Sequence, residues 1–384
     1  EARFLRAFAY YNLIDLYGNV PLLTEVSTSL PEQNSRQEIF NFVESELLEI
    51  QDLLKEAGAN EYGRVDRVAA WALLSKLYLN AEVWTGTDMY AQSLEYSNKV
   101  INSSYSINTN DANGNGSAYD ELFLADNDTN GAQDEFIFAI NFDGINSRTY
   151  GGTTFLVHAA VGGDMNAAEF GINGGWGGLR TTKALVNKFD YAVTATDADG
   201  DPVEWSDGRA MFFTEGQELE INTIANTFTD GYAVTKFKNV DSDGNPGSDE
   251  SGNFVDTDLP LIRLAEIYLN YAEVVARGKG GDVATAVGYI NELRERAFGD
   301  DSGNITSSDF NLDFVEAERS RELYWEGQRR TDLIRFNDFT TANYLWPFKG
   351  GAKNGTAVEP FRRLFPLPSN IIAINPNLTQ NPGY

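Results

Sequence analysis

The feature that most constrains the fold is a helical pattern that occurs twice, far apart in the chain. Leu77–Asn80 (Leu-Tyr-Leu-Asn) leads into Ala-Glu-Val at 81–83, and Ile267–Asn270 (Ile-Tyr-Leu-Asn) leads, one residue later, into Ala-Glu-Val at 272–274. In both places a glycine-containing turn and a second amphipathic segment follow. A single helix pair cannot bury its own apolar face, so we expect the two pairs to belong to one stacked helical array.

Apolar residues at helical spacing predict further helices around these pairs. The full set of expected helices is 2–16, 35–55, 66–83, 88–101, 261–277, 284–296 and 310–328. Ser35 and Glu38 form a capping box at the start of the second helix, and Gly18 with Pro21 ends the first. The pattern therefore predicts a mostly α-helical fold of tetratricopeptide-like helix–turn–helix pairs.

The helix expected over 310–328 alternates acidic and basic residues. These charged residues include Glu316, Glu318, Arg319, Arg321 and Glu322, and Arg329 follows directly after the segment. Opposite charges three or four positions apart lie on one helix face. We interpret this helix as part of a partly buried ion-pair network.

The middle of the chain has a different composition. Residues 103–257 are rich in Gly, Asn, Asp and Thr, and short apolar runs such as Phe136–Ile140 predict a few short strands. The Pro- and Asn-rich tail from 365 onward is expected to be an extended strap. We expect one domain over 1–384, with a helical scaffold at 1–102 and 258–337 and an irregular, loop-rich part at 103–257 and 338–384.

Charge excludes several classes of partner. The chain has 29 Lys and Arg against 57 Asp and Glu, a formal net charge of −28. Nucleic-acid binding is not expected, because phosphate contacts come mainly from Lys and Arg, and adsorption to an anionic membrane is disfavoured for the same reason. The chain opens at Glu1, without Met and inside a helical pattern, so we expect a missing N-terminal segment that carries any export signal or lipid anchor.

Catalytic and cofactor signals are sparse. The chain has no Cys and one His, His158, so a nucleophile–imidazole arrangement would depend on that single residue. No local motif selects a carboxylate pair for glycoside hydrolysis. Asp197–Asp201 and Asp241–Asn245 alternate oxygen ligands like calcium loops, but both lack the Gly and Glu of an EF-hand. We expect no enzyme and no cofactor, with an irregular calcium site left open beside ordinary turns.

Aromatic residues are the remaining functional signal. The chain has 6 Trp, 18 Tyr and 24 Phe. Exposed rings offer flat apolar faces on which the C–H faces of sugars can lie, with polar neighbours that fix the hydroxyls. Trp84 lies at a hairpin turn, and Trp176 and Trp205 lie in polar loops. These three residues are candidates for glycan binding.

Several segments resemble the SusD/RagB family. They follow that family's order over nearly the whole chain and are Phe4–Leu22, Leu77–Gly86, Pro260–Leu269, Arg321–Phe336 and Asn375–Tyr384. The resemblance implies a lipid-anchored protein on the outer face of the bacterial outer membrane. It also implies a partner, a SusC-like TonB-dependent transporter, over which the protein closes as a lid. Its implied role is to capture oligosaccharides or polysaccharides without cleaving them.

Two segments resemble blocks that carry aromatic sugar platforms in the family's starch-binding prototype. In Arg209–Thr214 and Lys236–Asn239, Phe213 and Phe237 stand where that prototype has Tyr and Trp. The stacking faces would remain, but the phenol hydroxyl and the indole N–H are absent. A starch-like α-glucan and a laminarin-like β-glucan therefore both stay open as ligands. The alternatives are a helical-repeat scaffold that binds peptides and a glycoside hydrolase.

Overall fold

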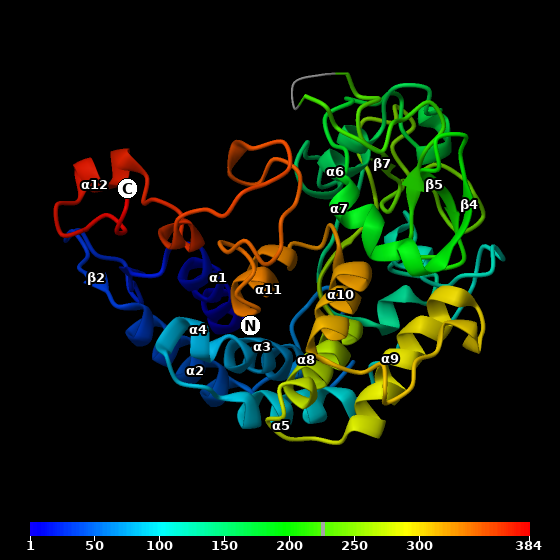
Figure 1. The fold of residues 1–384 in the computed structure, drawn as a ribbon. Coiled ribbons are helices and arrows are strands. Elements are labelled where there is room, and N and C mark those ends of the chain that lie inside the picture. Colours follow the sequence, from blue (N-terminus) through cyan, green and yellow to red (C-terminus); the bar gives the residue numbers. More distant parts are fainter. Residues whose placement is uncertain (224–226) are drawn as a thin grey trace.

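The computed structural model describes residues 1–223 and 227–384 (Figure 1). Its helices form a curved layer on which the loop-rich part rests. The main helices are α1 (Ala2–Tyr17), α2 (Arg36–Ile50), α3 (Arg67–Leu79), α4 (Ala81–Thr85), α5 (Tyr90–Ile101), α8 (Leu264–Ala276), α9 (Val283–Phe298), α10 (Leu312–Leu323) and α11 (Arg329–Arg335). Within this layer α1 packs on α2, α3 on α5, α5 on α8, and α8 on both α9 and α10. The prediction of a mostly helical fold built from helix pairs is confirmed.

Local sequence explains where these helices begin and break. Ser35 and Glu38 form the expected capping box at the start of α2, and the carboxylate of Asp66 accepts from the backbone N–H groups of Val68 and Ala69 at the start of α3. The helix expected over 66–83 is divided at Asn80 into α3 and α4. The Asn80 side chain donates to the Lys76 carbonyl at 2.9 Å and accepts from Arg335 at 2.9 Å, which ties the break to α11.

The helix expected over 310–328 is shorter than predicted. It ends at Leu323, because Tyr324 is extended and Trp325 has a φ of 63°, in the left-handed region that stops a helix. The Tyr324 carbonyl, which a continuing helix would use, accepts instead from Lys236 Nζ at 2.6 Å. Gly327, with a φ of 78°, then turns the chain into α11.

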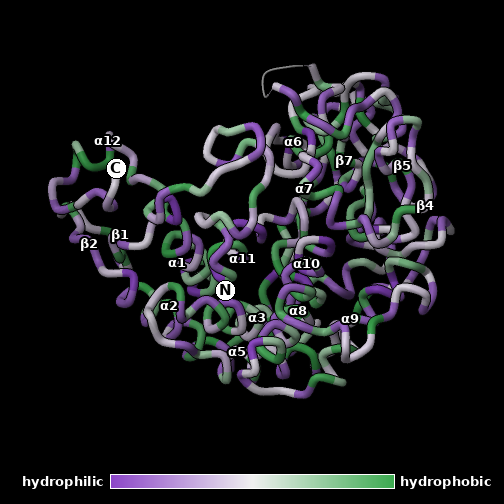
Figure 2. Tube along the Cα trace, in the orientation of Figure 1, coloured by the Kyte–Doolittle hydropathy of each residue, from purple (hydrophilic) through white to green (hydrophobic). Residues whose placement is uncertain are grey.

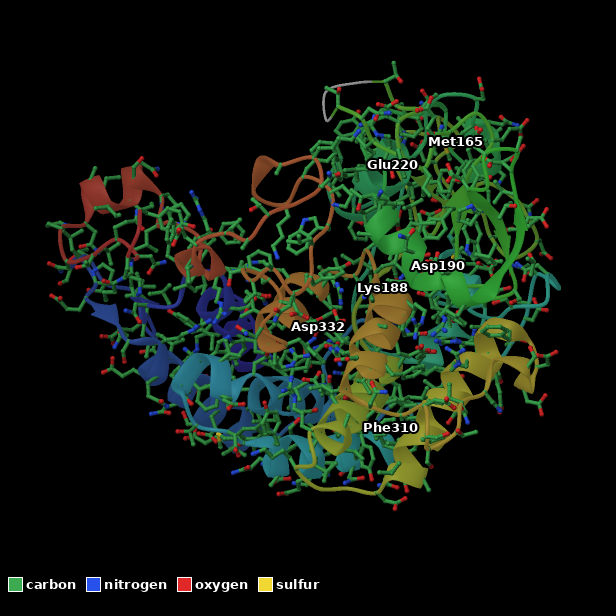
Figure 3. The ribbon with its side chains drawn as sticks, viewed as in Figure 1. Met165, Lys188, Asp190, Glu220, Phe310 and Asp332 are labelled. Atoms are coloured by element: carbon green, nitrogen blue, oxygen red, sulfur yellow. The ribbon has the colours of Figure 1, made fainter. Side chains whose placement is uncertain are left out.

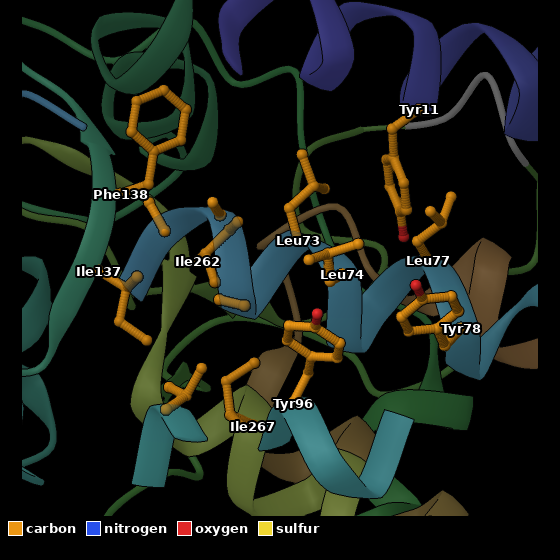
Figure 4. Packing of buried hydrophobic residues seen from close by; sticks show 14 of the residues in the cluster. Tyr11, Leu73, Leu74, Leu77, Tyr78, Tyr96, Ile137, Phe138, Ile262 and Ile267 are labelled. Carbon is orange, nitrogen blue, oxygen red and sulfur yellow. The ribbon is translucent and has the colours of Figure 1, made fainter. Parts of the chain in front are cut away.

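The main hydrophobic core lies between the helices of the scaffold. Figure 4 shows side chains of α3 (Leu73, Leu74 and Leu77) packed among residues from α1, α5 and the β3–β8 pair. Figure 2 shows apolar and polar residues mixed along the helices of this layer. The central helices α3 and α8 are buried on nearly all sides, as expected for helices covered by neighbours on several faces. Leu73, Leu74 and Leu77 are fully buried, so this core fixes the scaffold on which the rest of the chain rests.

Within the described residues, the loop-rich part contains short two-stranded ladders, single 3-10 turns and short α-helices. Two of these helices lie in its central section, α6 (Gly152–Ala160) and α7 (Lys183–Val186). The antiparallel ladders of the chain are β1 (Val20–Pro21) with β2 (Gln33–Asn34), β3 (Phe136–Ile140) with β8 (Leu259–Arg263), β4 (Val193–Thr196) with β5 (Pro202–Trp205), and β6 (Phe212–Phe213) with β7 (Ala233–Val234). The strand predicted at Phe136–Ile140 is thus confirmed. It pairs with β8, the strand that leads directly into α8.

The C-terminal tail is a strap with one short helix in it. The predicted extended conformation is interrupted by α12 (Ser369–Ile374). Asn381 holds the tail to the scaffold, because its side-chain amide donates to the carbonyls of Tyr17 at 2.9 Å and Phe365 at 2.8 Å.

A buried ion-pair network joins the scaffold to the loop-rich part. Arg209, after β5, contacts Glu318 at 2.7 Å and Glu322 at 3.1 Å, both on α10, and Arg263 contacts Glu322 at 2.6 Å. All of these side chains are almost completely buried. The predicted ion-pair network on this helix is therefore confirmed. Figure 3 labels Lys188 and Asp332, which pair with Glu316 and Arg319 and so mark two contacts of α10 with its surroundings.

Among the described residues, no helix has both the length and the apolar surface needed to cross a membrane.

Candidate functional site: an exposed aromatic surface

Two of the predicted aromatic platforms lie in the core instead. Trp84 is 5% exposed and packs edge-on against Tyr11, with ring centroids 5.2 Å apart. Phe237 is 3% exposed and packs edge-on against Phe123 at 5.0 Å. Neither ring presents a free face to a sugar, so the structure contradicts these two predictions. Burial in a packed cluster is the physical reason, and local sequence did not reveal it.

Two further candidates are half-buried. Trp205 packs edge-on against Phe212 at 5.3 Å. Phe213 lies on β6, beside the hydrophobic cluster that also contains Phe237. Within the part of the chain that the structure describes, neither the Trp205 ring nor the Phe213 ring contacts Trp176. Their roles in binding remain predictions.

Trp176 stands in a group of exposed rings. Trp176 is 46% exposed, Tyr150 is 62% exposed and Phe155 is 44% exposed. The Trp176 ring centroid lies 6.1 Å from Phe155 and 6.3 Å from Tyr150, and Tyr150 lies 4.9 Å from Phe254. We call these four residues the aromatic surface. Sequence reasoning found Trp176 and missed the other three.

The glycine-rich loop that carries Trp176 caps the C-terminal end of α6. The carbonyl of His158 accepts from the N–H of Trp176 at 2.7 Å, and the carbonyl of Ala159 accepts from the N–H of Leu179 at 2.7 Å. The last carbonyls of a helix have no partner inside the helix. The loop supplies those partners, and in doing so it holds Trp176 beside Phe155, which projects from the same helix.

Gly175 makes this close approach possible. A Cβ at position 175 would lie 2.1 Å from the Val161 carbonyl oxygen, whereas a Cβ at Gly174 would meet nothing within 4 Å. Within this run of glycines, position 175 thus requires a residue without a side chain. The glycine lets the backbone of the loop lie against the end of α6.

His158 supports the aromatic surface from below. It is 1% exposed, and its ring is stacked on that of Trp176 with centroids 4.7 Å apart and planes 18° apart. Its Nδ1 lies 2.8 Å from the Gly174 carbonyl oxygen and its Nε2 lies 3.1 Å from the Asn253 carbonyl oxygen. The imidazole is thus engaged between two loops of the aromatic surface, and it has no contact with a nucleophilic side chain within the described residues.

Polar groups border the rings. Asn173 donates to the Asn253 side chain at 2.8 Å, and the Arg148 guanidinium lies 5.7 Å from the Phe254 ring centroid. The Asp249 carboxylate accepts from the N–H groups of Asn253 at 3.1 Å and Phe254 at 3.0 Å. Burial opposes ionisation of Asp249, but hydrogen bonds, first from Ser251, hold its pKa below the usual value. The surface thus combines apolar faces with amide and guanidinium groups that can bind hydroxyls.

The acidic loops are explained by turn chemistry. Asp197 accepts from the N–H groups of Asp199 and Asp201, each at 2.9 Å, and Asp241 accepts from Asn245 N–H at 2.7 Å. Such bonds to the following backbone are typical of Asx turns. Over 1–223 and 227–384, no group of three or more His, Cys, Asp or Glu side chains is arranged to hold a metal ion.

Comparisons with known proteins agree with the fold. A family model described as the SusD family matches residues 213–384. The chain is 39% identical to "Starch-binding protein SusD" of Bacteroides thetaiotaomicron, over 100% of this chain and 72% of that protein. It is 25% identical to "SusD-like protein P25" of Formosa agariphila, again over 100% of this chain and 72% of that protein.

Solved structures show the same architecture. A crystal structure of a SusD superfamily protein from Parabacteroides distasonis superposes with a TM-score of 0.71 at 24% identity, covering 100% of this chain and 78% of that one. Surface glycan-binding protein A from Bacteroides fluxus superposes with a TM-score of 0.71 at 21% identity, covering 100% of this chain and 77% of that one. Together with the identity to the starch-binding relative, these matches show that the chain belongs to the SusD family.

Proposed function

We propose that this protein captures a neutral oligosaccharide or polysaccharide on the aromatic surface and does not cleave it. The observation that carries the proposal is the exposure of Tyr150, Phe155 and Trp176 side by side on a rigidly built loop and helix. Large exposed rings are unfavourable in water unless a ligand covers them. A sugar covers them well, because its C–H face is flat and its hydroxyls can reach the bordering amides.

The charge of the chain supports a neutral ligand. With a net charge of −28, the protein repels anionic polymers at long range, while a neutral glycan is unaffected. A groove for acidic peptides would need a basic lining. Within the described residues, Arg148 is the one cation that lies over a ring of the aromatic surface. This favours the glycan over the peptide-scaffold alternative.

We further propose that the ligand is a glucan, either starch-like or laminarin-like. The 39% identity to a starch-binding relative supports a starch-like ligand. The burial of Phe237 removes one of the aromatic platforms that the family resemblance predicts, so a laminarin-like glucan stays open as the alternative. The engagement of His158 with two backbone carbonyls argues against an imidazole-based catalytic role.

The family resemblance supports a location and a partner. We propose that the protein lies on the outer face of the outer membrane, held by a lipid anchor, and passes its glycan to a SusC-like TonB-dependent transporter. We also propose that residues 1–384 act as one unit in this task, with the loop-rich part presenting the ligand and the helical scaffold supporting it.

Native affinity electrophoresis tests the binding proposal. The protein would be run through gels that contain starch, laminarin or no polysaccharide, beside a non-binding protein as the mobility reference. We expect retardation in the starch gel or the laminarin gel. Unchanged mobility in both, with the fold verified by circular dichroism, would contradict the glucan proposal.

A further inference from the structure

A cavity at the junction of the two parts is not used by the aromatic surface. It has a volume of about 340 Å³ and lies between α10, α11, α7 and the segment after α11. None of the four residues of the aromatic surface lines it. Its size is within the range of about 300–1,000 Å³ that is usual for small-molecule sites.

Five aromatic residues line this cavity. Tyr324 is buried, whereas Trp325, Phe339, Tyr344 and Trp346 are only partly buried. Trp346 lies 5.7 Å from Tyr344 and 6.0 Å from Phe339, measured between ring centroids, so three of the rings form one continuous wall. A wall of open rings in a concave site suits a saturated ring with an apolar face.

Two of the cations at this wall are paired with carboxylates. Arg329 lies over the Tyr344 ring at 5.1 Å and pairs with Glu316 at 2.7 Å. Arg330 lies over the Phe339 ring at 5.6 Å and pairs with Asp15 at 3.1 Å. A third cation, Lys349, lies 4.4 Å from the Trp346 ring centroid, and its Nζ donates to three backbone carbonyls. Because these groups already have partners and the whole chain is acidic, the cavity favours a neutral ligand over an anion.

One donor at the cavity has no acceptor. The Nε of Arg330 is buried, and no hydrogen-bond acceptor serves it within the part of the chain that the structure describes. A buried donor without a partner is costly, and native proteins seldom retain one without a ligand, water or functional reason.

The backbone around the cavity is strained. The non-glycine residues with positive φ in the described chain are Trp325 at 63°, Asn337 at 63° and Phe348 at 67°. Trp325 lines the cavity, and the other two flank the segment that carries Phe339, Tyr344 and Trp346. Asn adopts this conformation readily, but Trp and Phe seldom do, and such backbone strain gathers at functional sites. Their position here is an independent sign that this wall is held in a required shape.

We propose that this cavity is a second saccharide site, which takes a short neutral sugar or the end of a longer glycan chain. The inference rests on the proposed function, since it assigns the same class of ligand. Two sites on one molecule would hold a long glycan more tightly than either site alone, because binding at one raises the local concentration at the other. The aromatic surface would take internal segments of the polymer, and the cavity would take a free end.

Isothermal titration calorimetry with maltohexaose and with laminarihexaose tests the proposal. We compare the unaltered protein with Trp176→Ala, Trp346→Ala and Ala184→Trp. Ala184 also lines the cavity, so an indole at this position fills it while its aromatic wall stays intact. This variant keeps the test decisive if Trp346→Ala fails to fold.

We expect two sites in the unaltered protein. Trp176→Ala should remove one of them, and Ala184→Trp should weaken the other at least tenfold. If binding is abolished by Trp176→Ala and unchanged by Ala184→Trp, the second site is refuted and the proposed function stands. If the cavity variants alone abolish binding, the cavity site is supported and the aromatic surface is refuted. If neither sugar binds the unaltered protein, the glucan proposal and the second site are both contradicted.

Discussion

His158 is stacked on Trp176 with ring centroids 4.7 Å apart and planes 18° apart, and its two ring nitrogens contact the carbonyls of Gly174 and Asn253. A buried polar ring thus sets the position of an exposed apolar one. We regard His158 as a positioning residue, since it contacts the loops of the aromatic surface and is itself covered.

Replacing His158 by Ala should therefore weaken glycan binding without removing any exposed ring. We expect a several-fold rise in the dissociation constant, because Trp176 loses its support and the Gly174 and Asn253 carbonyls lose a shared partner. Calorimetry gives the affinity, and thermal unfolding shows whether the fold persists. If the affinity is unchanged while the protein stays folded, His158 has no positioning role.

Gly175→Ala should disturb the same loop through the backbone. The new Cβ would meet the Val161 carbonyl oxygen at 2.1 Å, so the loop must move away from α6. We expect a loss of about 1–3 kcal/mol in the free energy of unfolding, as for other overpacked sites, together with weaker glycan binding. Gly174→Ala is the matched control, because its Cβ meets nothing within 4 Å. Equal effects of the two substitutions would contradict this account of the loop.

The buried network should dominate the stability of the junction between scaffold and loop-rich part. Arg209→Met leaves Asp207, Glu318 and Glu322 without a cation that contacts all three. Breaking a buried pair in this way costs about 3–5 kcal/mol. Arg64→Met, which removes an exposed pair with Glu1, should cost far less, because water screens a surface pair. Urea unfolding of both variants measures the difference, and similar losses in the two would argue against the network as the main tie.

Acid should weaken the same network. Burial alone would raise the pKa of Glu318, but Arg209, Arg321 and Arg294 outweigh it and lower the pKa to about 2. An unfolded Glu titrates near 4.3, so between these two values the unfolded chain binds more protons than the folded one. The stabilisation is present above about pH 4.3 and is lost as the pH falls toward 2.

Glu318→Gln tests this linkage. The difference in unfolding free energy between the unaltered protein and this variant should be large at pH 7 and should shrink at pH 3. Urea unfolding at both pH values measures it. A difference that stays constant or grows as the pH falls would show that the ionised Glu318 is not the stabilising form.

Sequence periodicity predicted most of the scaffold, because one apolar face per helix leaves a clear pattern. It missed the end of α10, since the left-handed conformation of Trp325 is imposed by its surroundings and by the contact between Tyr324 and Lys236. Nothing in the local sequence of Trp325 signals it.

The candidate site was only partly predictable for a similar reason. Trp176 was identified from its polar, glycine-rich loop, but Tyr150, Phe155 and Phe254 join it through tertiary contacts that no local pattern shows. The same limit explains Trp84 and Phe237, whose burial depends on which distant residues cover them. The glycines at 151 and 152, where α6 begins, were the one available hint that Tyr150 lies in an exposed turn.

The most direct test of the central claim is the affinity of Trp176→Ala for a glucan that the unaltered protein binds, measured by calorimetry. Leu53→Ala is the control, because Leu53 is an exposed apolar side chain on the scaffold, away from the aromatic surface. Loss of one stacked ring predicts a dissociation constant roughly tenfold higher, equivalent to about 1.4 kcal/mol, with no change in the control. Equal affinity of Trp176→Ala and the unaltered protein would contradict the assignment of the aromatic surface as the site of glycan capture.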